Sequence, residues 1–155
     1  MAYADYEFYT NTFFGDVLTK DNADKWLTRA SDELDGPTFG RLTFAFPTVE
    51  AHAEKVRKAV CAIAEALFYI DVQRNAASAQ KAADGSYRGA VASVSSGRES
   101  ISYAVNGAGT AYAIAAASSE AQTNLIREIA VKYLANIPDA HGVNLLYAGG
   151  VRRVP

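Results

Sequence analysis

The fold is decided by residues 47–83, which read PTVEAHAEKVRKAVCAIAEALFYIDVQRNAASAQKAA. Thr48 can cap a helix, and Glu50 places a carboxylate in the first turn, where the helix dipole favours it. Apolar residues then recur on one stripe at helical spacing: Val49, Val56, Val60, Ile63, Leu67 and Ile70. No Gly or Pro interrupts the run before Gly85. The pattern predicts a helix of about 40 to 50 Å, the spine against which other elements pack.

Composition is typical of a soluble globular protein. The chain has 155 residues, of which 50% are hydrophobic and 21% charged, and this length predicts one domain over 1–155. A net charge of −2 gives no general reason to expect nucleic-acid binding. The single cysteine, Cys61, excludes an internal disulfide and a cysteine-based zinc cluster. Without a signal peptide or a long apolar run, we expect a protein of the cytoplasm or of an assembly made there.

Two further segments have helical periodicity. Residues 19–35 begin with a capping residue, end at Gly36-Pro37, and carry one apolar face formed by Ala23, Trp26, Leu27, Ala30 and Leu34. A second helix is predicted within 111–138, starting at Ser118, Ser119 or Glu120 and stopped by Pro138. Residues 111–118 form either a first, weaker helical piece or a loop. The fold class is therefore mainly α: a small helical bundle around one long central helix.

The segment 84–110 changes character, because Gly, Ser and Tyr replace helix formers. Alternating residues predict a short β-hairpin, or two strands near 90–95 and 100–105, with turns at Ser-Gly 96–97 and Asn-Gly 106–107. An isolated hairpin is marginally stable in water, so this one needs a partner. Strand addition across subunits is one solution.

Both ends of the chain are apolar. The arm at 1–18 is rich in aromatic residues, which need burial against the core or against a neighbouring subunit, and the core is the commoner outcome. Residues 139–155, DAHGVNLLYAGGVRRVP, have no helical period but many apolar side chains. We interpret them as an extended C-terminal tail that docks into a partner.

One charged cluster needs an explanation. Asp32, Glu33 and Asp35 lie near a helix C-terminus, which is unfavourable for carboxylates. They hold a cation or a partner's arginine, or they form a solvated face, which is the commoner case. Arg41 lies among apolar residues and should reach a buried carboxylate or helix-end carbonyls. With Asp35 and Asp32 the nearest carboxylates, we predict a structural ion pair between Arg41 and Asp35.

The usual catalytic constellations are missing from the sequence. His52 and His141 have no metal-ligand spacing, and Cys61 lies mid-helix among apolar residues, as a small buried side chain would. Ser95-Ser96 lacks the nucleophile-elbow frame, and the glycines at 107–109 lack a phosphate-loop lysine. We therefore expect no enzyme, no catalytic residue, no cofactor and no metal.

Several motifs occur together in a recognisable order. RASDELD and TFGRL (29–35 and 38–42), KVRKAVCAIAEAL (55–67) and IREIAVKYLANIPDAHGVNLLYAGGV (126–151) resemble segments of phage head–tail connector (adaptor, head-completion) proteins. SGRESISYAV (96–105) is similar to a short segment of the same family. The resemblance covers most of 20–151. This chain differs by lacking the usual Gly in SISY and by a longer Ala-rich insert at 106–118.

The resemblance implies a structural protein of the virion neck, assembled in the host cytoplasm. Such adaptors are small helical bundles that form a homo-oligomeric ring, usually of about twelve copies. The ring lies beneath the portal protein, contacts stopper or tail proteins, and lets genomic DNA pass without strong binding; no membrane is involved. Carried over to this chain, the residues that dock onto the portal or a neighbouring subunit would be Leu145, Leu146, Tyr147, Val151, Arg152 and Arg153.

Two alternatives remain open. A neck stopper or tail-completion protein would contact the tail rather than the portal. A small ligand-binding or enzymatic helical bundle, a different class, would use the carboxylates at Asp32–Asp35 together with Arg41 in a concave pocket.

Overall fold

The computed structural model describes residues 2–80 and 110–148. The chain divides into two compact units. Unit 1 consists of Met1–Leu67 and Ile126–Pro155, and unit 2 of Phe68–Leu125. The division falls within two helices, α4 and α8, so each of them contributes residues to both units.

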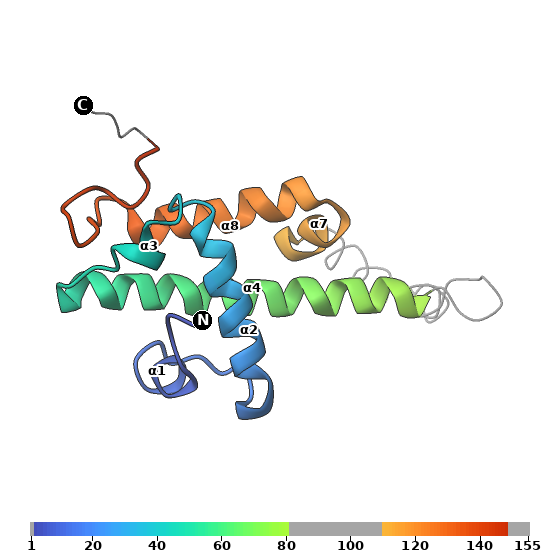
Figure 1. The fold of residues 1–155 in the computed structure, drawn as a ribbon. Helices are drawn as coiled ribbons and strands as arrows, with labels where there is room; N and C mark the ends of the chain where they lie inside the picture. Colours follow the sequence, from blue (N-terminus) through green and yellow to red (C-terminus); the bar gives the residue numbers. More distant parts are fainter. Residues whose placement is uncertain (1, 81–109, 149–155) are drawn as a thin grey trace. The chain divides into compact units, whose positions relative to one another are not determined.

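The described residues are mainly helical, which confirms the predicted fold class at that level (Figure 1). The helices are α1 (Tyr6–Asn11), α2 (Lys20–Asp35), α3 (Arg41–Phe44), α4 (Glu50–Gln80), α7 (Ala111–Ala117) and α8 (Ser119–Leu134). Strand pairing in the described ranges is limited to an isolated bridge between Pro138 and Asn144. The predicted hairpin at 90–105 lies outside the described residues.

Helix α4 follows its predicted pattern. In unit 1 the stripe residues Val56, Val60, Ile63 and Leu67 are buried. Val49 is half exposed, because the helix begins at the next residue and Val49 only supplies the carbonyl for its first turn. On the outer side, Lys58 pairs with Glu54 and Arg57 with Glu50. The long central helix is thus amphipathic where it passes through unit 1.

Helix α2 also forms as predicted. Thr19 closes a capping box with Asn22, which satisfies free backbone N–H groups of the first turn. All five residues of the predicted apolar face are buried. The helix ends at Asp35 because Gly36 and Pro37 follow.

The region predicted as 111–138 contains two helices. Thr110 caps α7 by accepting a hydrogen bond from the Ala113 N–H, so the alternative of a helical first piece is the one observed. Helix α8 ends at Leu134, before Pro138, because Asn136 adopts a left-handed backbone with φ 65°. That early end leaves Pro138 free to begin the C-terminal loop.

In the described part of unit 2, an arginine and a pair of aromatic residues connect the helices. Arg74 of α4 donates through Nε to the Ala116 carbonyl at 3.3 Å and through Nη2 to Gln122 Oε1 at 2.6 Å. The rings of Tyr69 and Tyr112 stack with centroids 4.9 Å apart. These contacts attach α7 and the start of α8 to the second half of α4. No helix in the described part of the chain is both long and apolar enough to cross a membrane.

Candidate docking surface

The C-terminal residues of unit 1 fold into a compact loop, 137–148, instead of an extended tail. Asp139 nucleates it: Oδ1 accepts from the N–H groups of His141 (2.8 Å) and Val143 (3.0 Å). The Asp139 N–H donates back to the Val143 carbonyl at 2.7 Å. Gly142 supplies the left-handed turn at φ 83°, where a side chain would be strained. We correct the predicted extended tail accordingly for residues 139–148.

This C-terminal loop is attached to the rest of unit 1. The Leu145 side chain is fully buried, and its N–H donates to the Ile137 carbonyl at 2.9 Å. The Ala140 N–H donates to the Ala45 carbonyl, just after α3, at 2.9 Å. Leu145 was predicted to dock onto a partner, and this is corrected: burial in its own unit already removes its apolar surface from water.

Arg41 has a different partner from the one predicted. Its Nη1 lies 3.7 Å from Asp139 Oδ2, and its Nη2 donates to the Tyr147 carbonyl at 3.0 Å. Asp35, the predicted partner, instead accepts from the Tyr3 hydroxyl at 2.7 Å. The physical reason is burial: the Asp139 side chain is only 1% exposed, and a carboxylate so buried needs a cation and donors. Arg41 Nε is buried without a hydrogen-bond partner, so this attachment is incomplete.

Two of the predicted docking residues meet at an open surface. Leu146 and Tyr147 line a shallow hollow together with Ala135, Asn136 and Asn144, which we call the 135–147 hollow. Tyr147 is 57% exposed, while Leu146 is half-buried, with its N–H bonded to Asn144 Oδ1. Val151, Arg152 and Arg153 lie outside the described residues.

The N-terminal arm, residues 2–18, packs on its own unit, so the core alternative is the one observed. Tyr9 is fully buried; its hydroxyl donates to Glu65 Oε1 at 2.7 Å and accepts from the N–H groups of Val17 (2.8 Å) and Leu18 (3.0 Å). Burial and the hydrogen bond to Glu65 raise the pKa of Tyr9 to about 12. Gly15 lies so close that an added Cβ would come 2.1 Å from the Tyr9 ring.

A second tyrosine completes the attachment of the arm. The Tyr3 N–H donates to Ser31 Oγ at 2.9 Å, and its hydroxyl donates to Asp35. Burial, followed by this hydrogen bond, raises the pKa of the Tyr3 hydroxyl. Asp35 therefore has a structural role at the end of α2.

Four aromatic residues of unit 1 remain more than half exposed: Phe14 (80%), Phe44 (69%), Tyr147 (57%) and Phe39 (53%). Phe14 and Phe39 have left-handed backbones, with φ of 60° and 55°, and each precedes a glycine. A bulky side chain in that region is strained, and such strain clusters at functional sites. Sequence reasoning missed both residues, although the repeated Phe-Gly pair was a signal.

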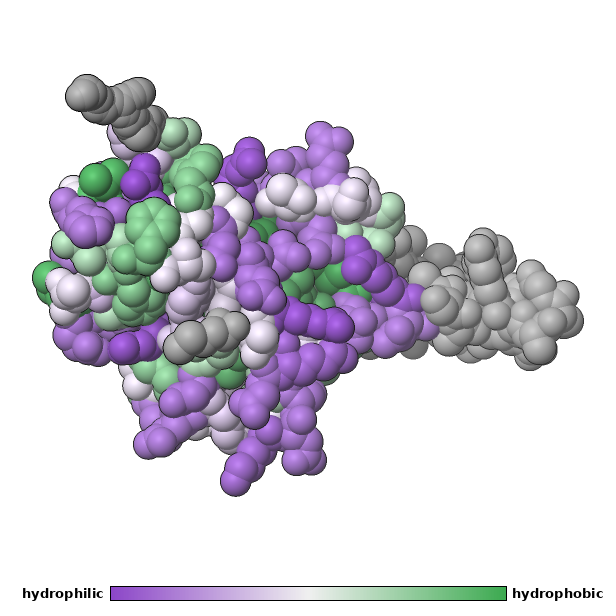
Figure 2. Space-filling view, in the orientation of Figure 1, coloured by the Kyte–Doolittle hydropathy of each residue, from purple (hydrophilic) through white to green (hydrophobic). Residues whose placement is uncertain are grey.

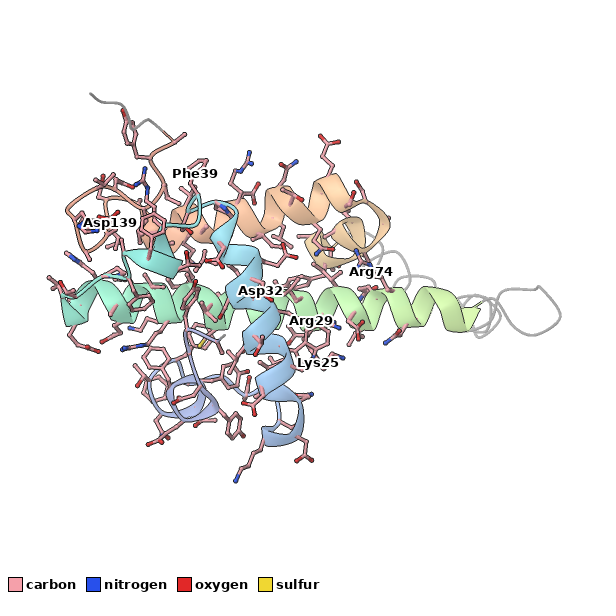
Figure 3. The ribbon with its side chains drawn as sticks, in the orientation of Figure 1. Lys25, Arg29, Asp32, Phe39, Arg74 and Asp139 are labelled. Carbon is pink, nitrogen blue, oxygen red and sulfur yellow. The ribbon has the colours of Figure 1, made fainter. Side chains whose placement is uncertain are left out.

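On the face drawn in Figure 2, hydrophobic residues gather over one part of unit 1. Figure 2 shows hydrophobic residues gathered over α3 and the C-terminal loop, whereas the surface over α2 is mostly hydrophilic. Phe39 and Asp139 lie near each other at this end, and Lys25, Arg29 and Asp32 follow α2 (Figure 3). The candidate docking surface is therefore the hollow and its surroundings.

The structure does not bring the carboxylates of Asp32–Asp35 together with Arg41, as the alternative of a ligand-binding or enzymatic bundle requires. Asp32 and Glu33 are exposed and form no ion pair with another described residue, while Asp35 and Arg41 are each engaged elsewhere. Cys61 is buried, and burial raises the pKa of its thiol to about 12. Among the described residues, no three His, Cys, Asp or Glu side chains are grouped to hold a metal ion.

Compared with models of protein families, with curated proteins and with solved structures, the chain has no match.

Proposed function

We propose that this chain is a structural head–tail connector of a tailed phage, an adaptor that forms a ring below the portal. The ring would join capsid to tail and let DNA pass through its bore. Two things support the proposal: the order of the connector-like motifs along the chain, and the aromatic residues that unit 1 leaves in solvent.

The exposed aromatics are the observation that carries the proposal. Phe14, Phe39, Phe44 and Tyr147 are all more than half exposed within one compact unit. The exposed part of an apolar ring gains no burial from the fold, whereas aromatic side chains are enriched at protein interfaces and at their binding hot spots. Their number on so small a unit favours a protein that works in an assembly.

The proposed docking surface has fewer residues than the sequence predicted. Leu145 and the aromatic residues Tyr3 and Tyr9 are used inside unit 1. Leu146 and Tyr147 at the hollow remain, together with Val151, Arg152 and Arg153, which follow along the sequence. Arginine pairs well with carboxylates of a partner because its guanidinium donates in a fixed fork.

The proposal is tested by the mass of the assembled particle. The purified chain should form a discrete ring of about twelve copies in native mass spectrometry, and the ring should bind the portal protein encoded with it. A strict monomer that binds neither itself nor the portal would overturn the proposal. Binding to a tail protein but not to the portal would favour the stopper or tail-completion role instead.

A further inference from the structure

We propose that Phe14 of one copy inserts into the 135–147 hollow of the next copy. The inference rests on the proposed ring and names the contact that would build it. The contact joins an exposed phenylalanine on the N-terminal arm of one copy to the hollow at the C-terminal loop of the next.

Phe14 is displayed on a rigid support. It is the most exposed of the large hydrophobic residues described, at 80%, and its backbone is left-handed. The residue before it, Phe13, stacks on Tyr9 with centroids 5.9 Å apart, and the residue after it, Gly15, lies against the same ring. The Tyr9 hydroxyl makes three hydrogen bonds to other parts of the unit. A side chain held outward in this way loses little conformational freedom on binding.

The hollow suits an aromatic side chain. Ala135 and Leu146 give it apolar walls, and Tyr147 contributes an aromatic ring. The main-chain carbonyl of Tyr147 accepts a hydrogen bond from Arg41. A phenyl ring placed there would bury apolar surface and make an aromatic contact with Tyr147, which is worth more than area alone. The amides of Asn136 and Asn144 complete the lining and can bond to the backbone of the incoming arm.

The two surfaces lie on different sides of the unit. In Figure 1, α1, which precedes Phe14, lies on one side of the first half of α4, and the C-terminal loop lies on the other. Phe13 and Gly15, on either side of Phe14, lie against Tyr9 of α1, so Phe14 stays on the α1 side and does not fill the hollow of its own chain. A contact between two different surfaces is heterologous, and it continues from copy to copy until a ring closes.

Charge complementarity identifies the occupant as another copy. The arm, residues 2–18, carries Asp5, Glu7 and Asp16 and no Lys or Arg, and Asp16, two residues after Phe14, is exposed. Around the hollow, residues 133–148 contain one carboxylate, Asp139, which is buried and paired with Arg41. Lys132 of α8 is exposed, three residues before Ala135. Opposite charges around the two surfaces would steer one copy onto the next and fix their orientation.

The test uses two variants that each disable one half of the contact. Phe14→Ala removes the inserted ring and keeps the hollow. Ala135→Glu places a carboxylate at an exposed position of the hollow, where it repels the acidic arm, and keeps Phe14. Analytical ultracentrifugation of the full chain then measures the assembly of each variant and of their equimolar mixture.

Each variant alone should be a monomer at concentrations where the unchanged chain forms a ring. Mixed, they should form a one-to-one heterodimer, because the Phe14 of the Ala135→Glu chain still finds the intact hollow of the Phe14→Ala chain. The heterodimer should dissociate more readily at high salt, which screens the charges. Ile114→Ala is the control, since Ile114 is also a large hydrophobic residue that is more than half exposed, but it belongs to unit 2 and to neither surface of the contact, so the ring should stay intact.

A ring that survives Phe14→Ala, or variants that do not associate when mixed, would overturn this contact while leaving the connector proposal standing. If the unchanged chain is a monomer and does not bind the portal protein, both the contact and the connector proposal are overturned. Phe14→Gly guards against misfolding as the cause of any loss. Glycine relieves the left-handed strain, so this variant should unfold at a higher temperature than the Phe14→Ala monomer and still fail to assemble.

Discussion

The N-terminal arm and the C-terminal loop of unit 1 solve the same problem in different ways. Both are apolar ends. The sequence left the core or a neighbouring subunit open for the arm and predicted a partner for the C-terminal end, and in the structure the arm and residues 137–148 both fold onto their own unit. The arm is anchored by a neutral hydroxyl, that of Tyr9, which makes three hydrogen bonds inside a buried site. The loop is anchored by Leu145 and by an ion pair in which Arg41 Nε has no partner.

The difference shows what separates a fixed end from a docking end. Where one buried polar group finds all its partners, the surrounding backbone is determined and its neighbours become rigid. Where a guanidinium is only partly satisfied, the anchor is weaker and the nearby surface stays open. The arm thus supports a displayed side chain, Phe14, and the loop borders a hollow.

The largest expected effect is on the apolar anchor of the loop. Leu145→Ala should lower the free energy of unfolding by about 2–5 kcal/mol, because it removes buried methyl groups and leaves a cavity. Urea denaturation followed by circular dichroism measures the change. Leu146→Ala is the matched control and should cost less, since Leu146 is only half-buried. Equal losses for the two variants would mean that the loop is not anchored by Leu145.

The next effect is on the polar anchor of the arm. Tyr9→Phe keeps the ring but removes the hydroxyl, which leaves the Leu18 N–H and the Glu65 carboxylate without this partner. The free energy of unfolding should fall by about 1–3 kcal/mol. Tyr6→Phe serves as control, because the Tyr6 ring stacks on Tyr9 without being fully buried, and it should change stability by less than about 0.5 kcal/mol. If both substitutions are neutral, the hydroxyl is not the anchor.

The ion pair of the loop should matter less than the hydroxyl of the arm. Arg41→Met keeps much of the side-chain packing and removes the charge. It should cost about 1 kcal/mol, because the lost pair is long at 3.7 Å, the buried and unpartnered Nε goes with it, and Asp139 still accepts two backbone hydrogen bonds. Thermal unfolding is the measurement. Lys58→Met, which breaks the surface pair with Glu54, should cost less than about 0.5 kcal/mol. A loss for Arg41→Met larger than that for Tyr9→Phe would reverse the ranking of the two anchors.

Sequence reasoning succeeded where a pattern faces a single core. The apolar face of α2 and the stripe of α4 were predicted because helical periodicity places these residues on one side, and burial follows from that geometry. The start of α2 at Lys20 follows in the same way from capping by Thr19. The start of α8 at Ser119 follows from Ser118, whose Oγ accepts from the Ala121 N–H at 3.3 Å and which was one of the three predicted starts.

Sequence reasoning failed where a contact joins residues that are far apart along the chain. Nearness along the chain favoured Asp35 as the partner of Arg41, whereas the folded loop brings Asp139 to it from the other end of the sequence. Of the residues predicted to dock, Leu146 and Tyr147 line the hollow, whereas Leu145 is buried. Composition could not separate them, because a folded loop and an extended tail of similar composition differ in their backbone hydrogen bonds. The Asp139-to-Gly142 spacing was the overlooked sign of a turn.

The last prediction concerns the dependence of stability on alkaline pH. It has the smallest effect near neutral pH, and it distinguishes the arm from the loop. The pKa of Tyr9 is raised to about 12 in the fold by burial and by its hydrogen bond to Glu65, from a usual value of 10.0. A raised pKa means that the folded state favours the protonated hydroxyl. Its contribution to stability is therefore complete below pH 10 and is lost as the pH rises toward about 12.

This loss should belong to the arm, where the hydroxyl with the raised pKa lies. We expect the unfolding temperature of the unchanged chain to fall steeply above pH 10, and that of Tyr9→Phe to fall less, with Tyr3, whose pKa is also raised, accounting for part of the remaining slope. A parallel decline in both chains would show that the Tyr9 hydroxyl titrates as it does in water, and the arm would then be anchored by ring packing alone.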